Sequence, residues 1–311
     1  MNTLHLRYAI EVAKTKSISQ ASANLYMAQP NLSKAIHELE ASVGIKIFER
    51  SSKGVVPTAK GFEFLKYAKN VLDDIEKMKS LKDSENIQET NISIPRGSYI
   101  AKAFADLVAD LDEKKEINIH YCETNSKETI MNVAEENYDI GVARYQTVNE
   151  TYFMDYIKEK GLDVHPVLTF KCVVVMSKSH PLARRKIVKY EDLVETSIEL
   201  VHGDNVIPYT AKSASGLSLN NKRRIFVYER GSQFELLSQV TNSYMWASPV
   251  PGDTLSAFGL VQKTCDVPNN EFKDVLIFKK GHELTELEKK FLEKLKLERD
   301  IVLKHISEGG K

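Results

Sequence analysis

The sequence predicts an α+β fold in three parts: an N-terminal winged helix-turn-helix, a long helix, and a larger C-terminal α/β domain. The stretch QPNLSKAIHELEASVG, residues 29–44, has the apolar spacing of a short amphipathic helix. Residues 58–81 carry a second, longer apolar stripe of the same kind. From about residue 90, short apolar strands alternate with helical stretches, which is typical of an α/β sheet domain. A length of 311 residues allows about two domains, each with its own core.

The charge is balanced over the whole chain but not along it. The 43 Lys and Arg residues equal the 43 Asp and Glu residues, so the chain is not a polycation. Residues 1–60 hold eight basic against four acidic residues, a balance of +4, and the remainder therefore carries −4. A basic N-terminal segment followed by an acidic remainder is typical of a small nucleic-acid-binding module joined to another domain. On charge alone, chance in a short segment explains the imbalance equally well.

The cysteines and the N-terminal residues indicate the expected cellular compartment. Cys122, Cys172 and Cys265 are an odd number without paired spacing, so we predict free thiols and no disulfide framework. No apolar run has membrane-spanning length, and the N-terminus lacks the features of a signal peptide. We therefore expect a cytoplasmic protein with no membrane partner, no metal site and no cofactor.

The first sixty residues predict two short helices, a turn, a third helix and a β-hairpin. Residues 3–14 form the first amphipathic helix, and Ser19 is predicted to cap the second. A turn at residues 26–28 leads into the third helix, where Pro30 fits the first turn and Gly44 fits the end. In residues 45–58, apolar pairs flank a polar tip at 49–54, which predicts a two-stranded wing.

The third helix has one apolar and one polar face. Leu32, Ile36, Leu39 and Val43 form the apolar stripe, and the side chains off the stripe can bond to base edges or phosphates. Such a helix is the recognition helix of a helix-turn-helix, and basic groups at a wing meet phosphates or the minor groove. The residues predicted to contact DNA are Ser17, Ser19, Gln29, Pro30, Asn31, Ser33, Lys34, His37, Arg50 and Lys53.

The run from Ser17 to Gly61 resembles the DNA-binding segment of LysR-type transcriptional regulators without a gap. The matching positions are Ala21, Leu25, Gln29, Pro30, Leu32, Ser33, Ile36, Leu39, Glu40, Gly44, Phe48, Arg50, Thr58 and Gly61. Ser22 stands where the family often has Ala, and Ala28 stands where it often has Ser or Thr before Gln-Pro. Loss of a capping hydroxyl at residue 28 costs about 0.5–2 kcal/mol of local stability.

The long helix at residues 58–81 is predicted to pair with a second copy of the chain. Leu65, Ala68, Leu72 and Ile75 repeat by three and four, and a lone apolar seam needs a partner. The alternative is that the stripe packs on the chain's own C-terminal domain. The resemblance favours dimerisation, because linker helices of the family pair. We assign residues 1–58 to the winged helix-turn-helix and 59–89 to the linker helix and its exit.

Residues 90–311 predict a sheet with helices, and ligands of such sheets bind at the carboxyl ends of strands. Strands are expected at 91–94, 117–122, 139–145, 170–177, 197–202, 224–229 and 275–280, with helices at 98–111, 126–136 and 235–242. The alternative is that the polar residues after these strands only cap helices. The residues predicted to bind an effector are Arg96, Gly97, Ser98, Tyr99, Thr124, Asn125, His202, Gly203, Gly231 and Ser232.

The resemblance also implies the architecture and partners of this domain. Effector domains of the family resemble periplasmic binding proteins, which implies a first lobe at about 90–165 plus 268–305 and a second at about 166–267. The second lobe departs from the family at residues 241–251, where Tyr244 and Trp246 make the wall aromatic. The implied partners are double-stranded DNA, a small anionic effector between the lobes, further copies in a homodimer or homotetramer, and RNA polymerase.

No catalytic motif competes with this interpretation. The sequence has no P-loop, no dinucleotide fingerprint after a strand, no HExxH and no GxSxG. We predict that the chain is not an enzyme but a sequence-specific, effector-responsive transcriptional regulator. Two alternatives remain open: a metabolite-sensing module in which residues 1–85 serve assembly, and a metabolic enzyme with a binding-protein fold.

Overall fold

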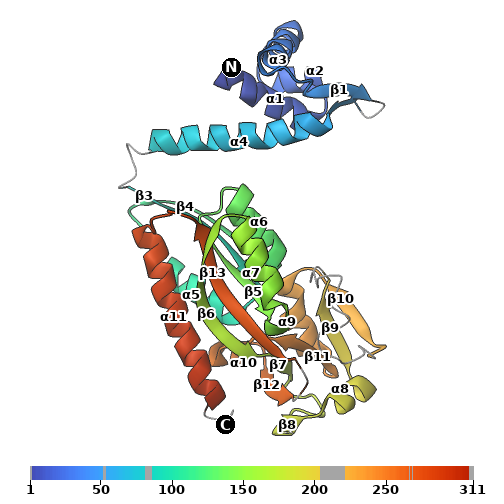
Figure 1. Ribbon diagram of the computed structural model, residues 1–311. Helices are drawn as coiled ribbons and strands as arrows, with labels where there is room; N and C mark the ends of the chain where they lie inside the picture. Colours follow the sequence, from blue (N-terminus) through green and yellow to red (C-terminus); the bar gives the residue numbers. More distant parts are fainter. Residues whose placement is uncertain are drawn as a thin grey trace. The chain divides into compact units, whose positions relative to one another are not determined.

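The computed structural model describes residues 2–51, 54–80, 86–203, 221–265, 267 and 269–307 (Figure 1). The chain divides into two compact units, residues 1–86 and 87–311. Each unit has hydrophobic clusters of its own. Over the described ranges, no helix has the length and apolarity needed to cross a bilayer.

The first unit begins with three helices around one apolar cluster. They are α1 (Thr3–Thr15), α2 (Ile18–Asn24) and α3 (Gln29–Val43). Gly44, at φ 71°, ends α3, and Ala28 precedes it without a side-chain cap, as the sequence predicted. The predicted cap of α2 was wrong: Ser17, not Ser19, accepts the N–H of Gln20. Ser17 has the extended backbone of a cap, whereas Ser19 already lies inside the helix.

A two-stranded wing follows, β1 (Phe48–Ser51) antiparallel to β2 (Gly54–Pro57). The Glu40 carboxylate of α3 accepts the N–H groups of Ile47 at 2.8 Å and Phe48 at 3.0 Å, which ties the wing to α3. The predicted tip was too long, because β1 extends to Ser51. Lys53 and the side chain of Arg50 lie outside the described part of the chain.

The long helix α4 (Ala59–Ser80) has apolar residues on two strips, one of which packs in the core while the other is exposed to solvent. Ala68 is buried in the cluster of the first three helices, where Phe64, Leu65 and Leu72 pack with it. On an adjacent strip, Tyr67, Val71 and Met78 are 62%, 40% and 61% exposed. Part of the stripe that we assigned to dimerisation therefore belongs to the unit's own core, because α4 packs against α1.

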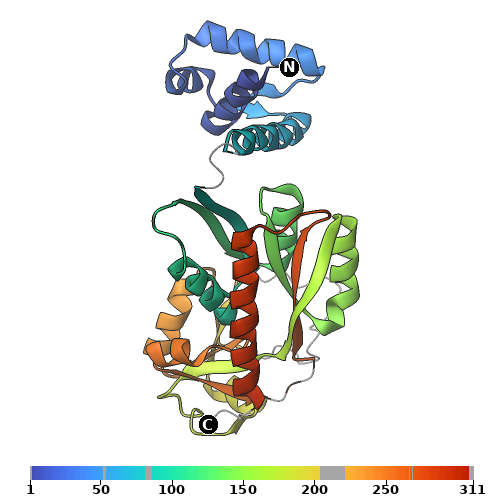
Figure 2. The ribbon, with the colours of Figure 1, turned by 90° about the vertical axis from the view of Figure 1, so that its left-hand side faces the viewer.

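The second unit begins and ends in a five-stranded sheet of order β4-β3-β5-β13-β6. Helices α5 and α11 cover one face and α6 and α7 the other, and Figure 2 shows α11 along its face. This first lobe contains β3 (Ile87–Pro95), α5 (Ser98–Ala109), β4 (Glu116–Thr124), α6 (Ser126–Glu135), β5 (Ile140–Gln146), the short 3₁₀ turn η1 (Thr147–Asn149), α7 (Glu150–Glu159), β6 (Leu162–Lys171), β13 (Glu271–Lys279) and α11 (Glu286–Ser307).

The middle of the unit forms a six-stranded sheet of order β10-β9-β11-β7-β12-β8, which we call the second lobe. Helices α9 and α10 pack in one of its clusters and α8 in the other. It contains β7 (Val173–Ser177), β8 (Ile187–Val188), α8 (Tyr190–Thr196), β9 (Ile198–His202), β10 (Arg224–Val227), α9 (Arg230–Gln239), β11 (Ser243–Ala247), α10 (Gly252–Ala257) and β12 (Leu260–Cys265).

The chain passes between the lobes at Cys172, not at residue 165 as the resemblance implied. The β6 strand pairs with β13 along its whole length, so it belongs to the first lobe. The apolar run 170–177 that predicted one strand is therefore split between the two sheets. Asn270 on the return passage donates its amide to the carbonyl of Cys172 at 2.8 Å, which joins the two passages.

A buried histidine in the second lobe predicts acid sensitivity. His180 is 3% exposed, its Nδ1 accepts the N–H of Leu182 at 3.0 Å, and burial lowers its pKa. Below the unfolded-state pKa of about 6.5, the unfolded chain binds a proton at this residue that the folded chain does not bind. The folded state therefore loses stability as the pH is lowered. From pH 7.5 to 5.5 this residue should cost at most about 1.4 kcal/mol.

Urea unfolding of the wild type and His180→Gln at both pH values measures this cost. The variant should lose less stability on acidification than the wild type, whereas His120→Gln, at an exposed position on β4, should behave as the wild type does. Equal pH dependence of the wild type and His180→Gln would contradict the assignment.

Candidate functional site

The polar side of α3 is open to solvent. Its exposed residues include Gln29, Asn31, Lys34 and His37, with Ser33 half-buried between them. The opposite side contributes Leu32, Ala35, Ile36 and Leu39 to the core. Lys34 is 78% exposed and lies 3.8 Å from Glu38, and such an exposed pair leaves the ammonium available to a stronger anion. We call Gln29, Asn31, Ser33, Lys34 and His37 the recognition face.

The helix before α3 is joined to this face at its start. Ser19 of α2 donates its hydroxyl to the side-chain oxygen of Gln29 at 3.0 Å, and Pro30 is exposed beside them. Ser17 is half-buried and uses its hydroxyl to cap α2. The beginnings of α2 and α3 therefore lie together, with N–H groups that favour an anion such as a phosphate.

Tyr26 is an exposed aromatic residue that the sequence predicted only as part of a turn. It lies between α2 and α3, is 97% exposed and has φ 52°, an uncommon conformation for a bulky residue. An exposed tyrosine in the turn of a helix-turn-helix is a candidate phosphate contact. The sequence signal was weak, because a lone Tyr between two short helices is compatible with packing.

A cavity of about 280 Å³ lies between the two lobes of the second unit. Its described lining contains Arg96, Arg144 and His202 but neither Asp nor Glu. Aromatic side chains from both lobes, namely Tyr145, Phe153, Phe234, Trp246 and Phe272, form much of the remaining wall. Burial raises the pKa of Cys172, which also lines it, to about 12, so this group stays a neutral thiol. The lining suits a small anion with an apolar body.

Half of the residues predicted to bind an effector line this cavity: Arg96, Ser98, Thr124, Asn125 and His202. The others lie outside its described lining: Gly97, Tyr99, Gly203, Gly231 and Ser232. Tyr99 is fully buried, and the ring of Tyr228 covers Gly203. Gly231 and Ser232 are exposed, and the next two residues of α9, Gln233 and Phe234, line the cavity instead. Trp246 is in the wall as expected, but Tyr244 is buried away from it.

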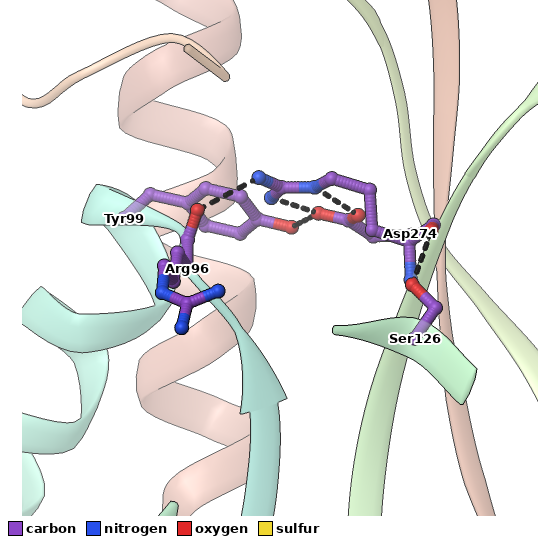
Figure 3. A network of polar contacts seen from close by, with 5 residues as sticks. Arg96, Tyr99, Ser126 and Asp274 are labelled. Atoms are coloured by element: carbon purple, nitrogen blue, oxygen red, sulfur yellow. Dashed lines mark hydrogen bonds and ion pairs between the residues drawn. The ribbon is translucent and has the colours of Figure 1, made fainter. Parts of the chain in front are cut away.

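A buried ion pair, part of the polar network in Figure 3, lies at the first-lobe wall of this cavity, where Arg144 is a lining residue. Arg144 of β5 donates to Asp274 of β13 through Nε at 2.7 Å and through the terminal nitrogen Nη2 at 2.8 Å. Tyr99 of α5 donates its hydroxyl to the same carboxylate. Arg144 also donates to the carbonyl of Arg96 at 3.1 Å, and its own N–H donates to the Ser126 hydroxyl at 2.9 Å. The network therefore positions the starts of α5 and α6.

The charges of this network are mutually dependent. Burial disfavours the charge on Arg144, but the Asp274 carboxylate outweighs it and raises the pKa of the guanidinium. Burial, followed by the negative charge of Asp274, raises the pKa of Tyr99 well above its ordinary value. Sequence reasoning missed Arg144 and Asp274, because 130 residues separate them and no motif marks either one.

The first turns of three helices contribute to the cavity. Ser98 begins α5, Ser126 begins α6 and Gln233 lies in the first turn of α9. The residues before α5 and α9, Gly97 and Glu229, make no side-chain cap hydrogen bond among the described residues, and helix starts favour negative charge. Arg96 donates to the carbonyl of Tyr228 at 3.2 Å, a contact between the two lobes at the rim.

Comparison with known proteins gives one family and a shared fold. Residues 4–62 match the family described as "Bacterial regulatory helix-turn-helix protein, lysR family". The chain is 26% identical over 209 residues to the probable RuBisCO transcriptional regulator of Thalassiosira pseudonana, and 27% identical over 204 residues to the HTH-type transcriptional regulator BenM of Acinetobacter baylyi. The first match covers 65% of each chain and the second 64% of each, just under two thirds of the relatives' lengths.

The fold is similar along nearly the whole chain to that of full-length CbnR in its structure with target DNA. The TM-score is 0.63 at 16% identity, and the match covers 96% of this chain and 100% of that one. At this identity the likeness concerns the fold: a helix-turn-helix, a linker helix and a two-lobed domain.

Proposed function

We propose that this chain, which belongs to the LysR family of bacterial helix-turn-helix regulators, regulates transcription by binding specific DNA sequences in response to a small molecule held between its two lobes. The observation that carries the DNA-binding part is the recognition face: five polar side chains on one side of a helix whose other side is core. Such a helix fits the major groove. The DNA partner makes the cytoplasm the expected compartment.

A salt-titrated binding assay tests this function. The full-length protein is mixed with DNA from around its own promoter and, in parallel, with scrambled DNA of the same length. We expect tighter binding to the promoter fragment at every salt concentration and protection of two separated half-sites. Equal, weak and strongly salt-dependent binding to both fragments would contradict specific recognition.

The effector part rests on the interlobe cavity. Its described lining has two arginines, hydroxyl groups at helix starts and no carboxylate, so we propose an anionic metabolite as the effector. Trp246 is the single tryptophan of the chain and lies in the wall. Its fluorescence therefore reports occupancy during titration of the protein with candidate carboxylates. A ligand that changes both this fluorescence and the DNA affinity would support the proposal. We also propose that RNA polymerase is the protein partner whose activity at the promoter responds to this change in DNA binding.

Dimerisation is proposed through the exposed strip of α4, formed by Tyr67, Val71 and Met78. Each apolar side chain buried on association contributes about 1.5–3 kcal/mol. Substituting all three by Ser should halve the mass of the protein in solution, whether the starting assembly is a dimer or a tetramer. Sedimentation analysis measures this mass.

Lys69→Ser is the matched control, because residue 69 is exposed on the far side of the same helix. The control should keep the wild-type mass. An unchanged mass for the triple variant would contradict pairing through α4.

A further inference from the structure

One buried amide nitrogen in the interlobe cavity has no hydrogen-bond partner among the described residues. Gln233 of α9 is 1% exposed and lines the cavity, and its Nε2 makes no hydrogen bond in the described part of the chain. Buried donors are almost always paired, since an unpaired one has lost water without replacement. The second-lobe wall therefore contains a donor that the described residues leave unsatisfied.

Another glutamine of the same lobe shows the ordinary arrangement. Gln262 of β12 accepts the N–H of Val250 at 2.8 Å through its side-chain oxygen, and this bond holds the turn before α10. Gln262 is structural, whereas no such bond explains Gln233. The second-lobe lining also contains the apolar side chains of Phe234, Met245 and Trp246, together with polar His202 and Ser248.

The opposite wall of the cavity has the groups that suit a negative charge. Arg96 and the hydroxyls of Ser98, Thr124 and Ser126 lie there, at or near the starts of α5 and α6. The described lining thus combines Arg96 and hydroxyl groups from the first lobe, aromatic side chains from both lobes, and the Gln233 amide from the second lobe.

We propose that Gln233 selects the effector by its chemical class: a small carboxylate with a flat apolar body and a second hydrogen-bond acceptor, such as a carbonyl oxygen, that accepts a hydrogen bond from Nε2 of Gln233. The inference rests on the proposed effector function of this cavity. A site that hydrogen-bonds its ligand rejects an analogue lacking the acceptor, because the buried amide then stays unpaired. A ligand with both groups also contacts both lobes, so its binding favours one relative orientation of the lobes.

The stability of the ligand-free protein gives a test that needs no ligand. Gln233→Leu removes an unsatisfied amide and Gln262→Leu removes a satisfied one. Gln233→Leu should keep or raise the Tm of the full-length chain, by about 2–4 °C for each kcal/mol of desolvation cost that is relieved. Gln262→Leu should lower the Tm. A fall with Gln233→Leu as large as that with Gln262→Leu would overturn the inference, since it would show a structural role for Gln233.

A matched pair of probes tests the selection itself. 4-Acetylbenzoate and 4-isopropenylbenzoate share the ring, the charge and a trigonal carbon of nearly the same shape, but only the first has a carbonyl acceptor. Titrations of the full-length protein, followed by Trp246 fluorescence, should give at least about tenfold tighter binding of 4-acetylbenzoate. In Gln233→Leu this preference should disappear, through weaker binding of 4-acetylbenzoate.

The outcomes separate this inference from the proposed function. Equal affinity of the wild type for both probes, binding of neither, or an unchanged preference in Gln233→Leu overturns the role of Gln233. Specific DNA binding by the wild type, measured on the same preparation, is unaffected by any of these results, and its absence would overturn the proposed function instead.

Discussion

Replacing Asp274 by Asn is expected to lower the free energy of unfolding of the second unit by about 3–5 kcal/mol, because it leaves a buried charge without its partner. Asp274 is fully buried, and the Arg144 side chain is 13% exposed. The carboxylate accepts two bonds from Arg144 and one from Tyr99. An amide has neither the charge nor two acceptor atoms, so the guanidinium loses its compensation.

Urea unfolding of the full-length protein, followed by circular dichroism, measures this loss. Asp192→Asn is the matched control, since the Arg185–Asp192 pair is exposed, with side-chain accessibilities of 52% and 31%. It should cost less than about 1 kcal/mol. The double variant Arg144→Met, Asp274→Leu should recover much of the stability, because no charge is left buried. A similar small loss for Asp274→Asn and Asp192→Asn would refute the assigned role.

The triple substitution of Gln29, Ser33 and Lys34 by Ala is expected to abolish sequence-specific DNA binding. Each base contact of this kind contributes about 1–3 kcal/mol of discrimination, so the specific affinity should fall by at least about 100-fold. None of the three side chains is part of the hydrophobic core, so the thermal stability should change little.

Affinities for the promoter fragment and the scrambled fragment measure this effect. The matched control is the pair Ala41→Ser, Ser42→Ala at exposed positions in the last turn of α3, which should bind as the wild type does. The triple variant should retain the weak, salt-dependent affinity for both fragments, because backbone contacts elsewhere persist. An unchanged footprint and affinity would rule out the recognition face as the reader of the sequence.

The first unit was largely determined by local sequence. Its helices follow from apolar spacings of three and four, a proline at the start of α3 and a glycine after it. Most core residues of the first unit lie within a few positions of another core residue in the sequence, so short periodic patterns are enough to predict which side chains are buried. The errors were local as well: Ser17 caps α2 in place of Ser19, because a shift of two residues is below the precision of a capping pattern.

The linker helix is an intermediate case. Its length and its apolar stripe were evident from periodicity, but the division of that stripe was not. Ala68 and Leu72 pack inward and Val71 and Met78 face solvent, because the positions of α1 and the wing decide which strip of α4 is covered.

The sequence by itself determined the resemblance of residues 4–62 to the lysR family model, the amphipathic pattern of α3 and the alternation of strands and helices, since all of these are carried by residues close together in the chain. Only the tertiary structure decided the passage between lobes at Cys172, the pairing of Arg144 with Asp274 and the choice of Gln233 over Gly231 and Ser232. These features depend on which strands become neighbours. Strand order and register determine which side chains face the cavity, and residues 130 positions apart meet only after the sheet has formed.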